Sequence, residues 1–302
     1  MKMIAAIRTN KWTDEEERLL TSLRPAFGAD VTVVFHDRGP GVAPPLPVVD
    51  VSAEWVSRNR LPLAPDWGWR CGDYFYYALR QARPGFDAYW LIEPDVHFTS
   101  DSSEFFGKFA SAGEDALGYQ LGPFGRDIRF VQGLPGMAHH RAIFALTRFS
   151  GRALDRLFEL RKAMSDRPLS VRDYPNDEIF CFSHMSAQQD MSCGRLEDYA
   201  PGWFENSQFA TDPDLLFEVV QRDMPAGRVL HPVRGRTSYK KALGRRLIGN
   251  LGLLMRIRDA IDLMSAEDIE DISQEAADQV RRAITDLHSR RALRHKRRAR
   301  TR

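Results

Sequence analysis

Short apolar runs alternate with segments of helical period through the first half of the chain. The apolar runs that predict strands span residues 3–7, 30–37, 88–95, 115–121 and 136–146. The segments that predict helices span residues 14–28, 68–83, 101–110 and 150–164. A Pro- and Gly-rich stretch at 38–50 and a polar stretch at 122–136 predict loops.

Alternation of this kind is typical of an α/β fold. It predicts a mainly parallel, twisted, Rossmann-like sheet with helices on both faces. Such strands are buried on both sides, which accounts for apolar runs such as AYWLI at residues 88–92. An apolar content of 43% is sufficient for a sizeable core.

Two carboxylates follow the strand that begins at Ala88. Glu93 and Asp95 lie two residues apart and can share one face, while Pro94 has no backbone N–H and ends the ladder. Ligand sites in open α/β sheets lie beyond the carboxyl ends of the strands. Because one or two carboxylates usually hold Mg²⁺ or Mn²⁺ together with substrate phosphates, the pair predicts a divalent-metal site for a diphosphate. A solvated turn is the alternative for so short a motif.

The stretch WRCGDYFYYALRQARPGFDAYWLIEPDV resembles the GT-A-fold, nucleotide-sugar-dependent glycosyltransferases of bacterial type. In that family a helix with a basic residue and an Asp before it leads into a strand that ends in Asp-x-Asp, where this chain has Glu-Pro-Asp. The resemblance covers about residues 3–235. It implies the following contacts: Asp95, with Glu93 beside it, on the metal; Arg70 and Asp73 on the nucleotide or donor sugar; Ile7, Arg8 and Thr9 at the base and ribose.

A second pair of acids stands in DYPNDEIFCFSHM. Asp177 and Glu178 open an apolar, helix-like run, and acids at a helix start are stabilised by the helix dipole. The alternative is catalytic, since transfer of a sugar to a hydroxyl needs a carboxylate to take the proton. The resemblance favours this role for an acid at such a position, with Asp177 as first candidate and Glu178 as second.

Histidines and tryptophans supply further candidates. His231, in RVLHPV, is either structural or, by the same resemblance, a third metal or phosphate contact. His139 and His140 are adjacent in a predicted strand and face opposite sides, so a structural role is expected. Three tryptophans could stack a base or a sugar, although burial in the core is the favoured expectation; they are Trp67, Trp69 and Trp203.

The C-terminal part has a different composition. Residues 238–264 mix basic and apolar side chains in an amphipathic pattern, which fits either a helix packed on its own domain or one lying on an anionic membrane. A capped helix is predicted from Ser265, with Asp268 at its third position. Residues 290–302 hold seven Arg and one Lys and no acid. Without these eight charges the net charge of +2 becomes −6, so the basic character belongs to the tail.

Cysteine usage and the N-terminus bear on the compartment. The three cysteines have no metal spacing and are odd in number, which favours a reducing environment. The apolar run within the first twelve residues is too short for the core of a signal peptide, and no stretch is apolar enough to span a bilayer. A cytoplasmic protein is expected, held in part at the inner face of the cell membrane.

Together these features predict three regions: a GT-A-like catalytic domain at 1–236, a helical extension at 237–288 and a disordered basic tail at 289–302. The expected function is metal-assisted transfer of a sugar, such as a hexose, from a nucleoside-diphosphate sugar, with uridine as the expected base. The acceptor would be a glycan or a lipid-linked sugar, as in polysaccharide biosynthesis. Alternatives are a non-catalytic sugar-nucleotide-binding protein of the same fold, or a membrane or nucleic-acid adaptor. Nucleic acid is the less favoured partner, because the tail alone supports only nonspecific binding.

Overall fold

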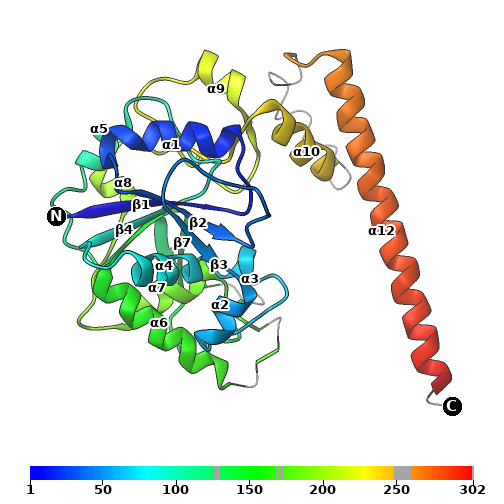
Figure 1. Ribbon diagram of the computed structural model, residues 1–302, viewed down its shortest axis with the longest axis horizontal. Helices are drawn as coiled ribbons and strands as arrows, with labels where there is room; N and C mark the ends of the chain where they lie inside the picture. Colours follow the sequence, from blue (N-terminus) through cyan, green and yellow to red (C-terminus); the bar gives the residue numbers. More distant parts are fainter. Residues whose placement is uncertain (126–129, 168, 171–172, 248–259, 261, 301–302) are drawn as a thin grey trace. The chain divides into compact units, whose positions relative to one another are not determined.

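The computed structural model describes residues 1–125, 130–167, 169–170, 173–247, 260 and 262–300 (Figure 1). The chain divides into two compact units. The first unit comprises Met1–Ala210 and Pro225–His231, and the second unit comprises Thr211–Met224 and Pro232–Arg302. The chain therefore leaves the first unit, returns to it for seven residues, and leaves it again.

A seven-stranded sheet, counted over the described residues, forms the centre of the first unit. Its strands, in spatial order, are β3 (Val48–Val51), β2 (Val31–His36), β1 (Met3–Thr9), β4 (Ala88–Ile92), β7 (His140–Ser150), β6 (Ala116–Pro123) and β8 (Cys193–Arg195). All run parallel except β7, which is antiparallel to both neighbours. The predicted fold class, a mainly parallel Rossmann-like sheet, is confirmed.

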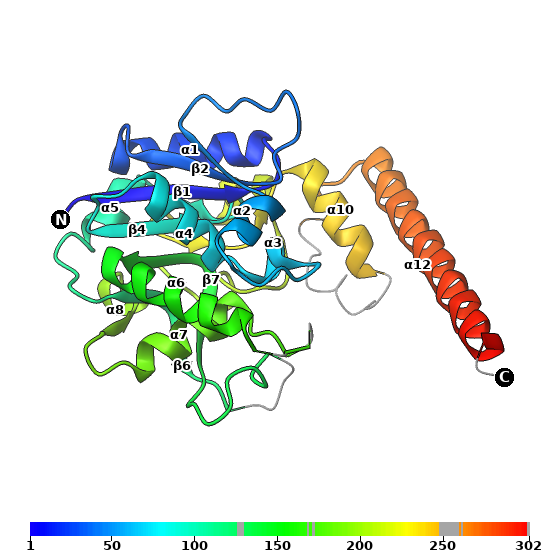
Figure 2. The same ribbon diagram turned by 60° about the horizontal axis from the view of Figure 1, so that its bottom comes forward.

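Helices cover both faces of this sheet because its strands bury alternate side chains on opposite sides (Figure 2). From β1, Ala5 and Ile7 pack with α1 (Asp14–Phe27) and α5 (Ser102–Gly107). Ile4 and Ala6 pack into the opposite core. On that side lie α4 (Asp73–Ala82), α6 (Gly151–Ser165) and α7 (Asp177–Ala187).

Local sequence signals explain where the principal helices begin. Thr13 and Glu16 form a capping box at the start of α1, Ser150 caps α6, and Asn176 caps α7. Capping of α7 by Asn176 places Asp177 and Glu178 in its first turn, where the helix dipole favours acids.

Three local expectations differ from the structure. The expected helix 68–83 is two helices, α3 (Trp67–Arg70) and α4, because the backbone is not helical at Cys71. The expected loop 38–50 ends in strand β3, and the short helix α2 (Ala53–Arg58) follows it. The strand expected to reach Asp95 ends at Ile92, because Glu93–Val96 closes a turn instead.

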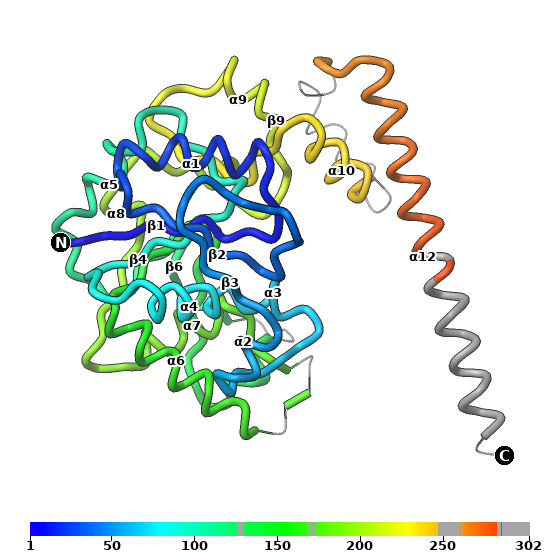
Figure 3. The backbone as a smooth tube through the Cα atoms, viewed as in Figure 1, coloured from blue at the N-terminus to red at the C-terminus, as the bar shows by residue number. Residues whose placement is uncertain are grey.

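Two further short strands complete the first unit. β5 (His97–Phe98) follows β4 and pairs with β10 (Val229–Leu230) in antiparallel fashion. The tube in Figure 3 follows the chain through β1, β2, β3 and β4, the parallel half of the sheet. The short helix α8 (Leu196–Tyr199) follows β8.

The second unit is mainly helical. It contains α9 (Phe217–Asp223), α10 (Arg236–Leu247), α12 (Ala266–Arg300) and the short parallel pair β9 (Leu215–Leu216) and β11 (Val233–Arg234). The predicted cap is present, since the Asp268 backbone donates to Ser265 Oγ and Ser265 N donates to Asp268 Oδ2. Residues 248–259 and 261 of the predicted amphipathic stretch lie outside the described residues. Over the described helices, none has the length and apolar character needed to cross a membrane.

Candidate active site

The carboxyl ends of β1 and β4 are adjacent, because the two strands are parallel and Ile7 pairs with Ile92. Arg8 and Thr9 therefore end β1 beside Glu93, the first residue after β4. The Glu93 N–H donates to the Ala145 carbonyl on β7 at 2.9 Å, and Val96 N donates to the Glu93 carbonyl at 3.0 Å. This turn brings Asp95 back to the same edge of the sheet.

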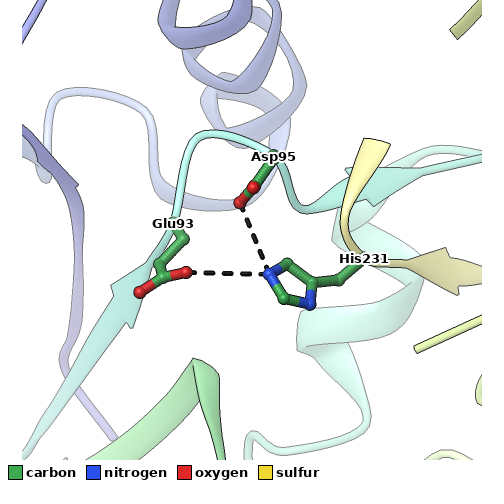
Figure 4. A group of neighbouring side chains, drawn as sticks. All are labelled: Glu93, Asp95 and His231. Atoms are coloured by element: carbon green, nitrogen blue, oxygen red, sulfur yellow. Dashed lines mark ion pairs between the residues drawn. The ribbon is translucent and has the colours of Figure 1, made fainter. Parts of the chain in front are cut away.

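Glu93, Asp95 and His231 form a cluster at this edge (Figure 4). One ligand atom from each side chain lies within 4.8 Å of the others. His231 Nε2 is 3.6 Å from Glu93 Oε2 and 3.5 Å from Asp95 Oδ1. His231 reaches the cluster because it follows β10, which is paired with β5, and because it forms a bridge with Phe209.

The orientation of the His231 ring is set by its other nitrogen. Nδ1 donates to the Ala210 carbonyl at 2.7 Å, so Nε2 is directed at the two carboxylates. Metal-binding imidazoles commonly have such a carbonyl partner. Burial lowers the pKa of His231, but Asp95 and Glu93 outweigh it and bring the pKa to about 10. Two carboxylates and one imidazole are a donor set that fits Mn²⁺ or Mg²⁺.

Arg8 lies between the Glu93–Asp95–His231 cluster and Asp177 at the start of α7. Its Nη1 is 3.2 Å from Glu93 Oε1 and 3.4 Å from Asp177 Oδ2. Its Nη2 donates to the carbonyls of Gly68 and Trp69 at 2.9 and 2.8 Å. The buried guanidinium thus holds acids from two distant segments, rather than presenting its charge to solvent.

Asp177 is buried and its oxygens are occupied. Oδ2 accepts from the Gly72 N–H at 2.8 Å as well as from Arg8, and Oδ1 accepts from the Glu178 N–H at 2.8 Å. Burial raises its pKa to about 8, although the charge of Arg8 acts in the opposite direction. Gly72 is required here, since a Cβ at this position would lie 2.4 Å from both Arg8 Nη1 and Asp177 Oδ2.

Glu178 has a different environment from its neighbour. It is half-buried, and burial raises the pKa of its carboxyl while Arg141 and a hydrogen bond from the Phe144 backbone lower it. Glu93 is close enough to raise the pKa further. Glu178 is therefore close enough to interact electrostatically with Glu93 and retains access to solvent.

Asp73 and Arg70, expected at the donor, both lie in ion pairs: that of Asp73 is buried, whereas that of Arg70 is with the partly exposed Asp66. Asp73 receives two hydrogen bonds from Arg161, at 2.8 and 3.0 Å, and a third from Tyr77 at 2.9 Å. Arg70 Nη2 donates to Asp66 at 2.7 Å. Arg161, which the sequence analysis did not single out, is fully buried and also donates to the Pro175 carbonyl at 3.0 Å.

The remaining candidates lie as follows. Ile7 is fully buried in the sheet, so its side chain belongs to the core. Thr9 Oγ1 donates to Glu16 at 2.7 Å and so ties β1 to α1. His139 Nε2 contacts the Leu134 carbonyl at 3.0 Å. Trp67 and Trp203 are buried as expected, whereas Trp69 is 63% exposed.

Comparisons with known proteins give fold-level similarity only. No family model and no curated protein matches the sequence. The chain is similar to a galactosyltransferase solved with donor and acceptor sugar analogues, at 12% identity and a TM-score of 0.44 over 74% of this chain and 78% of that chain. It is also similar to a protein described as a glucose-1-phosphate thymidylyltransferase from Bacillus anthracis, solved with sucrose. The identity is 10% and the TM-score 0.38, over 64% of this chain and 86% of that chain. A third similar structure is the inositol-1-phosphate CTP transferase from T. maritima. The identity is 8% and the TM-score 0.34, over 65% of this chain and 84% of that chain.

Proposed function

We propose that the protein is a glycosyltransferase that moves a sugar from a nucleoside-diphosphate sugar, with uridine as the base, to a hydroxyl of a glycan or lipid-linked acceptor. The observation that carries the proposal is the convergence of Glu93, Asp95 and His231 at the carboxyl edge of a parallel sheet. Binding sites in this class of sheet lie at that edge. A buried imidazole, oriented by a backbone carbonyl, and two carboxylates supply three ligand atoms for a divalent cation, which would replace the ring proton.

Glu93, Asp95 and His231 would hold the cation, and Asp95 would face the donor diphosphate. When bound, Mn²⁺ or Mg²⁺ neutralises the charge that develops on a diphosphate leaving group. Two of the three side chains are held in position by the backbone: the Ala210 carbonyl orients the His231 ring, and the turn after β4 positions Asp95. The diphosphate would otherwise meet only negative charge from the two carboxylates.

We assign the proton acceptor to Glu178 and a supporting role to Asp177. Both oxygens of Asp177 are engaged and the side chain is buried, so it holds Arg8 and the backbone of Gly72 in place. Glu178 is half-buried in the first turn of α7 and has a raised pKa. A carboxylate with a raised pKa is a stronger base toward an acceptor hydroxyl.

Ligand-induced stabilisation tests the proposal directly. Thermal unfolding is recorded with UDP-sugars and other nucleoside-diphosphate sugars, each with and without Mn²⁺. A ligand at 100 times its Kd stabilises the folded state by about 2.7 kcal/mol, a readily measured shift. We expect a shift that needs both donor and Mn²⁺, and that Asp95→Asn removes while the unliganded variant still unfolds in one cooperative transition.

The same experiment separates the alternatives. Absence of a metal-dependent shift with every donor would contradict the proposal. A shift without turnover, across a panel of glycan and lipid-linked acceptors, would instead identify a sugar-nucleotide-binding protein. Loss of the unliganded transition in Asp95→Asn would show that Asp95 supports the fold.

A further inference from the structure

Arg8 contributes to two groups of side chains at once. Its Nη1 is shared by Glu93, which follows β4, and Asp177, which opens α7. Its Nη2 is engaged by two carbonyls of α3, and the guanidinium lies over the Phe75 ring at 4.8 Å. The guanidinium is therefore fixed on every side by elements that are distant in the sequence.

The contact with Glu93 uses one carboxylate oxygen and leaves the other for the metal cluster. Glu93 Oε1 faces Arg8 at 3.2 Å, while Glu93 Oε2 faces His231 Nε2 at 3.6 Å. A glutamate side chain has three rotatable bonds and would sample other orientations without such a partner. Outer partners that orient a ligand are known to affect metal affinity strongly.

We propose that Arg8 is a positioning residue for the metal site: it anchors Glu93 Oε1 so that Oε2 meets Asp95 and His231, and it links this cluster to Asp177. The inference rests on the proposed metal site, and concerns the residue behind the ligands rather than the ligands themselves. The guanidinium of Arg8 is a rigid, planar set of donors that contacts two carbonyls and two carboxylates together. The compact ammonium group of a lysine cannot reach all four.

Arg8→Lys separates geometry from charge. The lysine keeps the positive charge, so a purely electrostatic role predicts unchanged metal binding. Removal of a cation would by itself strengthen the binding of a second cation, so weaker binding in any Arg8 variant cannot result from charge alone. A positioning role predicts that Mn²⁺ affinity falls about 10-fold to 100-fold in Arg8→Lys.

A matched control is available at Arg80. Its guanidinium makes a two-pronged contact to Asp155, with both hydrogen bonds at 3.0 Å, away from the metal cluster. Arg80→Lys likewise replaces an arginine that hydrogen-bonds to a carboxylate, and should leave Mn²⁺ affinity at the wild-type value. Affinities are measured by isothermal titration of the free protein with Mn²⁺ alone, and circular dichroism verifies that each variant is folded.

A double-mutant cycle with Glu93→Gln provides the decisive readout. If Arg8 acts through Glu93, the loss from Arg8→Lys disappears when Glu93 is already Gln, and the two effects are not additive. Additive effects, or unchanged affinity in Arg8→Lys, would overturn the inference.

Crystal structures of metal-free wild type and Arg8→Lys give an answer that does not depend on metal binding. The inference predicts that Glu93 Oε2 leaves His231 in the variant, and an unmoved Glu93 overturns it. A wild-type protein that binds no Mn²⁺ would contradict the proposed function, whereas the position of Glu93 would still decide the role of Arg8.

Discussion

Asp177 and Glu178 are neighbours in the chain with different access to a substrate, and substitution can separate their roles. Glu178→Gln removes the half-buried carboxylate and keeps its shape. We expect kcat to fall roughly 10² to 10⁴ with donor affinity unchanged, the usual contribution of a general base. Steady-state kinetics and donor titration on the same samples provide the measurement.

Asp177→Asn is the comparison for that prediction. Asparagine can still accept from Gly72 and Arg8, so a smaller loss of kcat is expected than in Glu178→Gln. If Asp177→Asn gave the selective loss and Glu178→Gln retained full activity, the base would be Asp177.

The buried carboxyl of Asp177 also predicts a dependence of stability on pH. Its pKa in the folded protein is raised to about 8, whereas in the unfolded chain it lies near the usual value of about 4. Between these values the folded state holds a proton that the unfolded state has released. The contribution of Asp177 to stability therefore falls as pH rises from about 4 to about 8.

Asp177→Asn has no such group, so its free energy of unfolding relative to wild type should increase across that window. Urea denaturation of both proteins at about pH 5 and about pH 8 measures the difference. A difference that is constant with pH would mean that Asp177 is ionised in the folded state at both.

At the residue scale, sequence anticipated the acids better than their partners. Glu93 and Asp95 were found because a continuous apolar strand, AYWLI, ends directly before them. His231 was suggested by resemblance and is indeed beside them. The contacts of Arg8 could not be foreseen, because they join residues separated by 60 to 169 positions and depend on how α3 and α7 pack. Arg161 gave no signal either, as it lies in an ordinary amphipathic helix.

Between elements, the Arg161–Asp73 pair joins α6 to the start of α4. Both side chains are buried, with exposed fractions of 0% and 1%. Arg161→Met leaves Asp73 as an uncompensated buried charge, so we expect a loss of about 3–5 kcal/mol in the free energy of unfolding. Denaturant unfolding with circular dichroism measures it.

Arg58→Met is the control for that substitution, because the Arg58–Glu54 pair on α2 is exposed. Exposed pairs contribute about 0–1 kcal/mol, so little change is expected. Equal effects in the two variants would show that the Arg161–Asp73 pair adds no more than a surface contact. A large effect would indicate a structural use of Asp73 in addition to any contact with the donor.

The elements themselves were predicted where the pattern is long and regular. Helices α1 and α6 and strands β1, β2 and β4 follow directly from apolar period and capping residues. The break between α3 and α4 was missed: the backbone leaves the helical conformation at Cys71, and the N–H of the next residue, Gly72, is donated to Asp177. Strand β3 was missed because its four residues follow a proline-rich stretch.

On the scale of the whole molecule, the basic C-terminal residues 290–302 predict attachment to an anionic surface. Each basic residue near such a membrane contributes about 1 kcal/mol. We expect the full chain to sediment with vesicles containing phosphatidylserine, and a chain lacking residues 290–302 to remain in solution. Donor binding should be the same in both.

Salt provides the check on this prediction. The Debye length falls from about 10 Å at 0.1 M to about 3 Å at 1 M, so an electrostatic attachment should weaken over that range. Equal sedimentation of the two chains would assign any membrane affinity to other residues. Absence of sedimentation at low salt would remove the membrane from the proposed setting.

The path of the chain between the two units has a consequence for synthesis. His231 belongs to the first unit, yet residues 211–224 before it and 232–302 after it belong to the second. During translation, Glu93 and Asp95 leave the ribosome early, and the imidazole follows 136 residues after Asp95. A nascent or prematurely terminated chain can therefore form most of the sheet without the third side chain of the cluster. The proposed three-residue metal site is therefore complete only once residue 231 has been added, and shorter chains lack one of its three side chains.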